Sequence, residues 1–481
     1  MHCQICFLEN DALNYISTRG ETPPLGFEDV VLAGLARDGG LYVPQAWPAL
    51  TQETIASFAG MPFAYVAVEV IHPFTGGAIS REELRRITTE AYARFGHPAV
   101  TPLVQVGTNR WVLELFHGPT LAFKDVAMQL LARLMDRVLA ERGQRATIIG
   151  ATSGDTGGAA IEAFRGSPRV DVAILVPEGR VSAVQRRMMT TPTEDNLHAI
   201  SVRGTFDDCQ ALVKAMFNDH GFRDRVNLAG VNSINWARIA GQVTYYFAAA
   251  VALGAPYRPV SFVVPTGNFG DIFAGYVAKR MGLPIEKLII ASNVNDILPR
   301  TLHGGSYEMR GVIATTSPSM DIQISSNFER YLFEASGRDA PLIRAKMRAL
   351  KETNSFDLGS LGDAMRRDFA AHAASEADVA QAIVRTSAAC GYLADPHTAC
   401  AIVAAEQELD DSGVPQIVLS TAHPAKFPDA MQAITGARPL LPERLEGLMK
   451  AKERFTTIDN DIGAAEAHVE SLTRAVLEGR G

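Results

Sequence analysis

The sequence has few of the features that cross-link a chain, anchor it in a membrane or bind it to nucleic acid. It holds only 5 cysteines among 481 residues, too few for a disulfide framework. Its longest apolar run, residues 245–255, is shorter than the roughly 20 residues that span a bilayer. Its start lacks the basic and apolar regions of a signal peptide. Acidic residues outnumber basic ones, 53 to 45, and the net charge is −8. We expect a cytoplasmic protein with neither membrane nor nucleic-acid partners.

A metal centre is also poorly supported. Cys3 and Cys6 have the CxxC spacing of zinc ligands, and His2 could add a third ligand. No second CxxC pair follows, and an isolated pair of thiols at a chain end is a weak indication of zinc. We therefore expect no metal site.

What the chain does contain is typical of a globular protein, with 47% hydrophobic and 20% charged residues. Its length suggests about three domains. Prolines near residue 100 and a change of pattern predict an N-terminal α+β domain over 1–98. A smaller α/β domain over 99–227 and a larger one over 228–481 follow, and the larger domain holds a mainly helical insertion at about 320–390.

From residue 111 onward, short apolar strands alternate with helical patterns. Strands of this kind are typical of parallel sheets covered by helices on both faces, so the predicted fold class is α/β. The charged C-terminal stretch, 441–481, is expected to be helical. The predicted strands are 111–116, 146–150, 170–176, 197–202, 260–264, 288–291 and 416–419. The predicted helices are 24–36, 81–95, 125–142, 157–164, 207–220, 242–253 and 271–281.

Four segments with unusual chemistry follow predicted strands, at the edge where open parallel sheets bind ligands. The first, 117–125, places Lys124 at the start of a helix. The positive end of the helix dipole disfavours an ammonium group there, and a neutral amine is what Schiff-base chemistry needs. The alternative is a surface lysine paired with Asp125.

Two further segments could bind anions. Residues 265–271 open a helix with two glycines, so that backbone amides could approach a phosphate, although an unliganded turn is the alternative. Residues 151–158 offer hydroxyls and amides that suit a carboxylate, or that simply cap the following helix. The candidates in these two segments are Gly267, Asn268, Phe269, Gly270, Asp271, Thr152, Ser153, Asp155 and Thr156.

The fourth segment is 420–426, which follows the last predicted strand. The hydroxyl of Thr421 could form a hydrogen bond with a ring nitrogen of a ligand. His423 is better explained as a structural histidine than as a catalytic one.

These four segments, in this order, resemble the threonine synthase family, a branch of the pyridoxal-phosphate enzymes with the tryptophan-synthase-β type of fold. The similarity includes residues 15–20, 38–44 and 231–238, and it extends from about residue 14 to 440. It implies two parallel-sheet α/β domains of pyridoxal-phosphate fold type II beside an N-terminal domain.

The resemblance also implies a role for each candidate. Lys124 matches the lysine that carries pyridoxal phosphate, and residues 267–271 match the loop that holds the phosphate of the cofactor. Thr421 matches the hydroxyl facing the pyridine nitrogen, and Asp155 lies where relatives place a residue near the ring hydroxyl. The loop that receives the carboxylate of the substrate is matched by Thr152, Ser153 and Thr156.

The implied reaction converts O-phospho-L-homoserine and water into L-threonine and phosphate. Its substrate needs a second, cationic phosphate site, for which Arg238 is the first candidate because it lies in a matched segment. The other candidates are Lys426, Arg19, Arg186 and Arg187. A related phospho-lyase that releases a keto acid and ammonia, or a non-catalytic carrier of the cofactor, is the alternative. The expected oligomeric state is a monomer or a homodimer.

Overall fold

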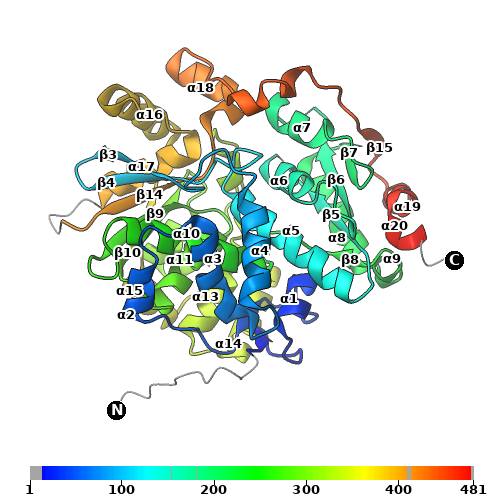
Figure 1. Ribbon diagram of the computed structural model, residues 1–481, viewed down its shortest axis with the longest axis horizontal. Coiled ribbons are helices and arrows are strands. Elements are labelled where there is room, and N and C mark those ends of the chain that lie inside the picture. The colour runs from blue at the N-terminus through cyan, green and yellow to red at the C-terminus, as the bar shows by residue number, and fades with distance from the viewer. Residues whose placement is uncertain (1–12, 153, 180, 409–412, 478–481) are drawn as a thin grey trace.

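A computed structural model describes residues 13–152, 154–179, 181–408 and 413–477. The chain forms two lobes, each built around a parallel sheet, and the N-terminal segment lies against the larger lobe (Figure 1). Cys3 and Cys6 lie outside the described residues, as does Ser153. Within the described ranges, no cluster of three or more potential metal ligands is found.

The larger sheet has six strands in the order β13-β10-β9-β14-β4-β3. Its neighbours pair in parallel except at one edge, where β3 is antiparallel to β4. Alternate residues of the central strands face opposite cores: Val263 packs with α17 on one face, and Phe262 and Val264 pack with α10 and α11 on the other. The bounds are β3 Leu103–Gly107, β4 Arg110–Glu114, β9 Val260–Pro265, β10 Ile285–Ser292, β13 Phe369–Ala373 and β14 Gln416–Ser420.

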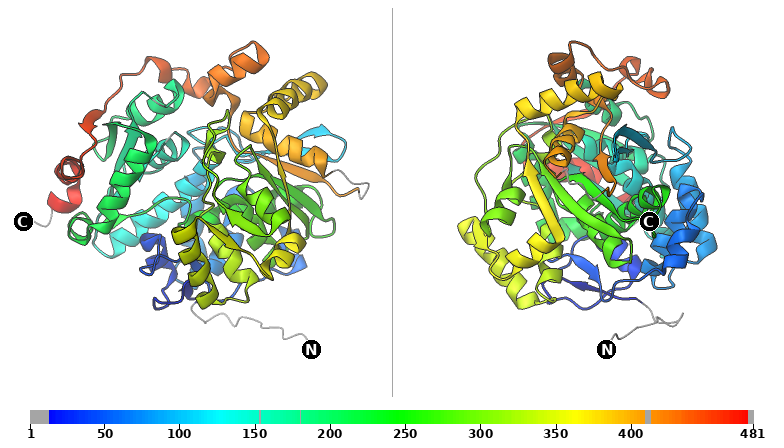
Figure 2. Two further views of the ribbon diagram at one scale, coloured as in Figure 1. Left: turned by 180° about the vertical axis from the view of Figure 1, so that it is seen from behind. Right: turned by 90° about the vertical axis from the view of Figure 1, so that its left-hand side faces the viewer.

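The smaller sheet has five parallel strands in the order β15-β7-β6-β5-β8. Its central strand β6 is buried along its whole length, which explains its mainly apolar sequence; the exception is Asp171, which pairs with Arg474. Helices α8 and α19 cover one face (Figure 2). The bounds are β5 Ala146–Ala151, β6 Val170–Pro177, β7 Leu197–Arg203, β8 Leu228–Ala229 and β15 Thr456–Asp459.

Two antiparallel ribbons complete the strands: β1 Tyr15–Ser17 with β2 Tyr42–Pro44, and β11 Ser306–Glu308 with β12 Ser355–Asp357. The helices of the N-terminal segment are α1 Phe27–Ala33, α2 Gln52–Ser57, α3 Phe63–Ile71 and α4 Arg81–Tyr92. Those of the two lobes are α5 Lys124–Glu141, α6 Asp155–Ala163, α7 Ala183–Thr190, α8 Phe206–Asn218, α9 His220–Arg225, α10 Trp236–Ala252, α11 Gly270–Arg280, α12 Ile297–Gly304, α13 Phe328–Ala335, α14 Ala340–Thr353, α15 Leu361–Asp368, α16 Glu376–Cys390, α17 Pro396–Gln407, α18 Pro428–Thr435, α19 Ile462–Leu472 and α20 Arg474–Leu477.

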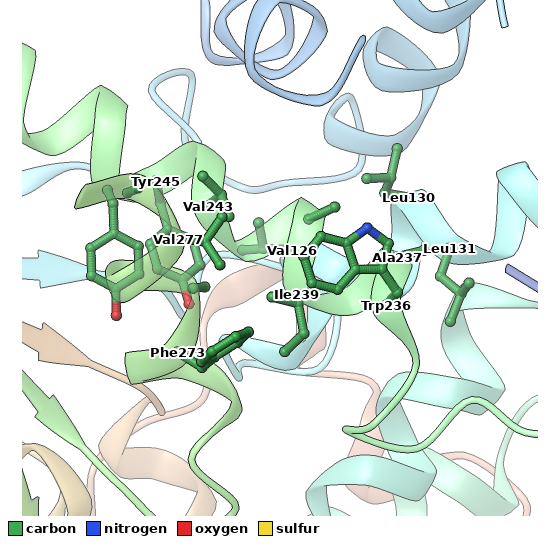
Figure 3. Packing of buried hydrophobic residues seen from close by; sticks show 14 of the residues in the cluster. Val126, Leu130, Leu131, Trp236, Ala237, Ile239, Val243, Tyr245, Phe273 and Val277 are labelled. Carbon is green, nitrogen blue, oxygen red and sulfur yellow. The ribbon is translucent and has the colours of Figure 1, made fainter. Parts of the chain in front are cut away.

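The main core joins three helices that carry residues of the candidate site. Side chains from α5, α10 and α11 interdigitate there, among them Leu130, Ile239 and Val277 (Figure 3). Trp236 is fully buried at the start of α10, and its ring lies 5.5 Å from that of Phe74. Because a core of this kind is packed as tightly as a crystal, it fixes the starts of these helices relative to one another.

The structure corrects two expectations about secondary structure. The predicted helical insertion at 320–390 contains β13, which is an edge strand of the larger sheet. The predicted helical C-terminal stretch contains β15, which extends the smaller sheet. The sheets also interleave in the sequence: β4 lies within the predicted segment 99–227 but pairs in the larger sheet, and β15 lies within 228–481 but pairs in the smaller one. No described helix, including the apolar α10, is long and apolar enough to cross a membrane.

Candidate active site

The four segments singled out in the sequence lie together where the two lobes meet. The first and fourth are joined by backbone hydrogen bonds, since the Phe123 N–H donates to the Thr421 carbonyl over 2.9 Å. The third reaches them through Asp155, whose carboxylate lies 3.6 Å from the Nζ of Lys124 and 2.6 Å from that of Lys426. The second contributes Asp271, whose pKa the nearby Lys124 helps to lower. The four strand ends therefore form one site, as expected for parallel sheets.

Lys124 is buried at the first position of α5. Burial lowers the pKa of its ammonium group; Asp155 opposes this effect, and Lys426 and Arg238 add to it. The alternative of a surface lysine paired with Asp125 is wrong. Asp125 instead accepts hydrogen bonds from the N–H and the hydroxyl of Thr120, at 2.8 and 2.7 Å. The site thus favours a neutral amine at Lys124, as the chemistry requires.

Asp155 connects both lobes. Its Oδ1 accepts from Lys426 and, at 2.8 Å, from the amide of Gln185, and its Oδ2 accepts from the Ser319 hydroxyl at 3.3 Å. Burial by itself raises the pKa of this carboxyl, but Lys426 and Lys124 together hold it well below its usual range. Asp155 is therefore a fixed negative charge beside Lys124.

The glycine loop, residues 267–271, has the geometry of an anion cradle at the start of α11. Phe269 precedes the helix in the left-handed region, with φ 62°, so that Gly270 and Asp271 form its first turn. A Cβ added to Gly267 would lie 2.8 Å from the carbonyl oxygen of Ser319, so only glycine fits there. The carbonyl of Asn268 accepts from the N–H of Asn327 at 3.0 Å. These features hold the backbone in place for a phosphate group.

Asp271 is buried behind this loop. Its carboxylate accepts hydrogen bonds from the hydroxyls of Tyr245 and Tyr246, the second at 3.0 Å, while its Oδ2 has no hydrogen-bond partner. Burial raises the pKa of Asp271 to about 6, although the two tyrosines and Lys124 lower it. The two tyrosines lie next to each other on α10, and their hydrogen bonds to Asp271 were not predicted from the sequence.

Arg238 differs from the other basic candidates. Its side chain is 2% exposed, donates to the Val231 carbonyl at 3.2 Å and has an Nε without a partner. Burial lowers the pKa of Arg238 to about 10, and its positive charge in turn helps to lower the pKa of Lys124. Each other candidate pairs with a carboxylate: Lys426 with Asp155, Arg19 with Glu329, and Arg186 and Arg187 with Glu453. Arg238 is the one candidate whose charge is left for a ligand.

The candidate residues with hydroxyl groups differ in their burial and in their hydrogen bonds. The Thr152 hydroxyl accepts from the N–H groups of Gly154 and Gly157, at 3.0 and 3.1 Å, so it orders the start of α6. Thr156 lies half-buried in the first turn of that helix. Thr421 is buried beside the start of α5. His423 is structural, because its Nδ1 accepts from the Ala425 N–H at 3.1 Å.

Comparisons with known proteins identify the family of this chain. Family models match most of the chain: "Threonine synthase N terminus" over residues 14–92, "Pyridoxal-phosphate dependent enzyme" over 95–420 and "Threonine synthase, C-terminal" over 398–469. The threonine synthase of Pseudomonas aeruginosa is 50% identical over 459 residues, covering 95% of this chain and 98% of its own. That of Saccharomyces cerevisiae is 40% identical, covering 98% and 99%.

Solved structures give the same result. The pyridoxal-phosphate-bound threonine synthase of Brucella melitensis superposes with a TM-score of 0.94 at 59% identity, covering 96% of this chain and 100% of its own. The yeast enzyme has a TM-score of 0.91 at 39% identity, covering 96% and 99%. The protein is therefore a pyridoxal-phosphate-dependent enzyme of fold type II. More narrowly, the chain belongs to the threonine synthase family.

Proposed function

We propose that this enzyme converts O-phospho-L-homoserine and water into L-threonine and phosphate. The observation that carries the proposal is the group of charges around Lys124: a buried amine whose pKa is lowered, the Asp155 carboxylate 3.6 Å from it, and a buried Arg238 for which the described residues supply no carboxylate partner. A substrate with both a reactive amino group and a phosphate suits this arrangement.

The residues present fit pyridoxal phosphate. Lys124 would hold the aldehyde carbon, and the backbone of residues 267–271 would hold the phosphate, because the loop can accept no Cβ at Gly267. The buried Thr421 would face the ring nitrogen, and Asp155 would lie near the ring hydroxyl. When bound, the cofactor supplies the electron sink for bond cleavage at the α-carbon of an amino acid.

Lys124 then has a second task, which is to move protons. Its lowered pKa lets the neutral amine accept a proton from the α-carbon and return one to the substrate later. Asp155 remains ionised throughout and stabilises the ammonium form of Lys124 when a proton is taken up. Burial of both groups keeps bulk water away from the reacting atoms.

Substrate recognition divides between the two lobes. Arg238 would bind the phosphate that leaves from the γ-carbon, since its guanidinium is not neutralised by the protein. The start of α6, with Thr152 and Thr156 beside it, would receive the carboxylate of the substrate at the positive end of the helix, and the sequence adds Ser153 as a candidate for the same role. Binding would thus draw the lobes together.

Product analysis tests this function. Incubation of the enzyme with O-phospho-L-homoserine should release L-threonine and phosphate in equal amounts, without ammonia. A keto acid and ammonia would indicate the related phospho-lyase instead. Absence of any product, with the cofactor bound, would support a non-catalytic carrier.

We also expect the enzyme to act in the cytoplasm as a monomer or homodimer, with the small substrate as its partner. Light scattering of the purified enzyme and fractionation of its native cells test these two expectations.

A further inference from the structure

A buried pair of residues behind the site has no part in the roles described so far. Asp395 caps the start of α17, accepting from the His397 N–H at 2.9 Å and the Thr398 N–H at 3.3 Å. The same carboxylate contacts the His397 Nδ1 at 2.8 Å. Asp395 is 0% exposed and His397 is 2% exposed, with the Phe427 ring packed 5.0 Å away.

The partners of His397 determine where its proton lies. The carboxylate of Asp395 is the acceptor in this contact, as it is for the two backbone N–H groups, so the Nδ1 of the histidine carries the hydrogen. The Nε2 faces the backbone N–H of Ser319 at 3.2 Å. Because a backbone N–H can only donate, this nitrogen accepts and has no proton. His397 is thus neutral and held in a single tautomer from both sides.

His397 contacts a segment that touches both the glycine loop and Asp155, the neighbour of Lys124. Ser319 belongs to a short 3-10 helix, Pro318–Met320, and its carbonyl oxygen lies against Gly267. Its hydroxyl donates to the Oδ2 of Asp155, the same oxygen that lies 3.6 Å from the Lys124 Nζ. Asp395, His397, Ser319, Asp155 and Lys124 therefore form one continuous line of contacts.

We propose that His397 is a positioning residue, which holds Ser319 so that the serine hydroxyl fixes Asp155 at its distance from Lys124. The Oδ1 of Asp155 is held independently by Lys426 and Gln185. Among the described residues, loss of the Ser319 hydroxyl would leave Lys124 as the remaining polar partner of Oδ2. The carboxylate would then move closer to the amine and stabilise its protonated form. This inference rests on the proposed function only for the task of Lys124.

Two substitutions of the same histidine separate this role from a purely structural one. In His397→Asn, the amide lies near the position of Nδ1, so it can still donate to Asp395 but no longer reaches Ser319. In His397→Gln, the amide oxygen lies near the position of Nε2, so it can still accept from Ser319 but no longer satisfies Asp395. The proposal predicts that the Gln variant keeps the wild-type site and that the Asn variant does not.

The measurement is the apparent pKa of Lys124 in the full-length, cofactor-free enzyme. It is obtained from competitive labelling with acetic anhydride across pH, read by mass spectrometry. His397→Asn and Ser319→Ala should both raise this pKa, by up to about one unit for one lost hydrogen bond. The double variant should show no further change, because both substitutions break the same line of contacts. In the cofactor-loaded enzyme, the pH dependence of the cofactor absorption should shift in the same variants.

Several results would overturn the proposal. A shift in His397→Gln without one in His397→Asn would mean that the histidine serves only the cap of α17. Equal behaviour of the two variants, or an unchanged Lys124 in Ser319→Ala, would contradict it as well. Ser319→Ala keeps every backbone contact, so it remains informative if a histidine variant does not fold. Labelling needs no substrate, so failure of this proposal is distinct from failure to produce threonine.

Discussion

At the scale of single residues, the site holds buried charges of two kinds. Asp155 is compensated by Lys426 and by hydrogen bonds from Gln185 and Ser319. Among the described residues, the side chain of Arg238 donates to the Val231 carbonyl, and its Nε has no partner. A buried charge without a partner reduces the stability of the folded protein, so its presence indicates binding rather than folding.

Replacing Arg238 by Ala should therefore affect substrate binding more than anything else. We expect the KM for O-phospho-L-homoserine to rise roughly tenfold or more, as for the loss of a charged hydrogen bond. The affinity for pyridoxal phosphate should change little, because other residues form the proposed cofactor site. Steady-state kinetics measure the KM of the variant and of the wild type. Arg187→Ala is the matched control, because Arg187 pairs with Glu453. An unchanged KM would remove Arg238 from the substrate site.

Asp271 predicts a pH dependence of stability. Burial raises its pKa from 3.8 to about 6 in the folded protein, so the folded state binds more protons than the unfolded state between these values. Wild-type stability should therefore fall as pH rises through this window. An asparagine at this position cannot ionise, so the Asp271→Asn variant does not lose stability in this way. Its free energy of unfolding relative to that of the wild type should therefore increase by about 2 kcal/mol between about pH 4 and pH 7.

Urea unfolding of the cofactor-free proteins at the two pH values measures this difference. Asp429→Asn, at a carboxylate that is 83% exposed, is the control and should show little change. If the stability difference between Asp271→Asn and wild type stayed constant with pH, the buried carboxyl would not titrate as described.

At the scale of elements, the candidate site residues lie in the turns that follow the strands. The strands themselves hold these turns in position relative to one another. The central strands and helices could be predicted because burial on both faces leaves a clear apolar pattern, as in β6. The edge strands β13 and β15 could not, since each has one partner; β15 has no buried residue and β13 is only partly buried. Their pairing depends on neighbours far away in the sequence.

The same limit applied to the site. Lys124 and the glycine loop could be proposed as site residues because their chemistry is local and because the segments resemble a known family. The contacts of Ser319 with Asp155 and of Lys426 with Asp155 join residues far apart in the chain, so no local pattern reveals them. Lys426 was one of several candidates for the substrate phosphate, after Arg238, and in the structure it pairs with Asp155.

The glycine loop can be tested with one added methyl group. A Cβ at position 267 would lie 2.8 Å from the Ser319 carbonyl, so Gly267→Ala should displace the loop or the 3-10 helix against it. We expect the affinity for pyridoxal phosphate to fall at least about tenfold, as misplaced amides lose a phosphate hydrogen bond. Gly304→Ala, where nothing lies within 4 Å of the new Cβ, is the control. Titration with pyridoxal phosphate, followed by absorbance, measures the affinity of both variants. Equal affinities would argue against a phosphate cradle at residues 267–271.

At the scale of the whole molecule, the C-terminal segment crosses from one lobe to the other. After α18 it passes α7 and ends as β15, α19 and α20 on the smaller sheet (Figures 1 and 2). Glu453 on this segment binds Arg186 and Arg187 of α7, the helix that also presents Gln185 to Asp155. The segment thereby supports the wall of the active site that α7 forms.

Glu453→Ala should loosen α7 without unfolding the lobe. The ion pairs are partly exposed, so we expect a stability loss of only about 1 kcal/mol. Hydrogen exchange should become faster in residues 183–190 and remain unchanged in α11, which lacks contacts with Glu453 in the described structure. Uniform exchange changes throughout the chain would contradict a local supporting role.

The proposed function depends most on Lys124, which would hold the cofactor and perform the proton transfers. Borohydride reduction of the enzyme with pyridoxal phosphate bound, followed by peptide mass spectrometry, tests this role. We expect one cofactor adduct, located on Lys124 and absent in Lys124→Ala. An adduct on another lysine, or no adduct in a protein that still makes threonine, would contradict it.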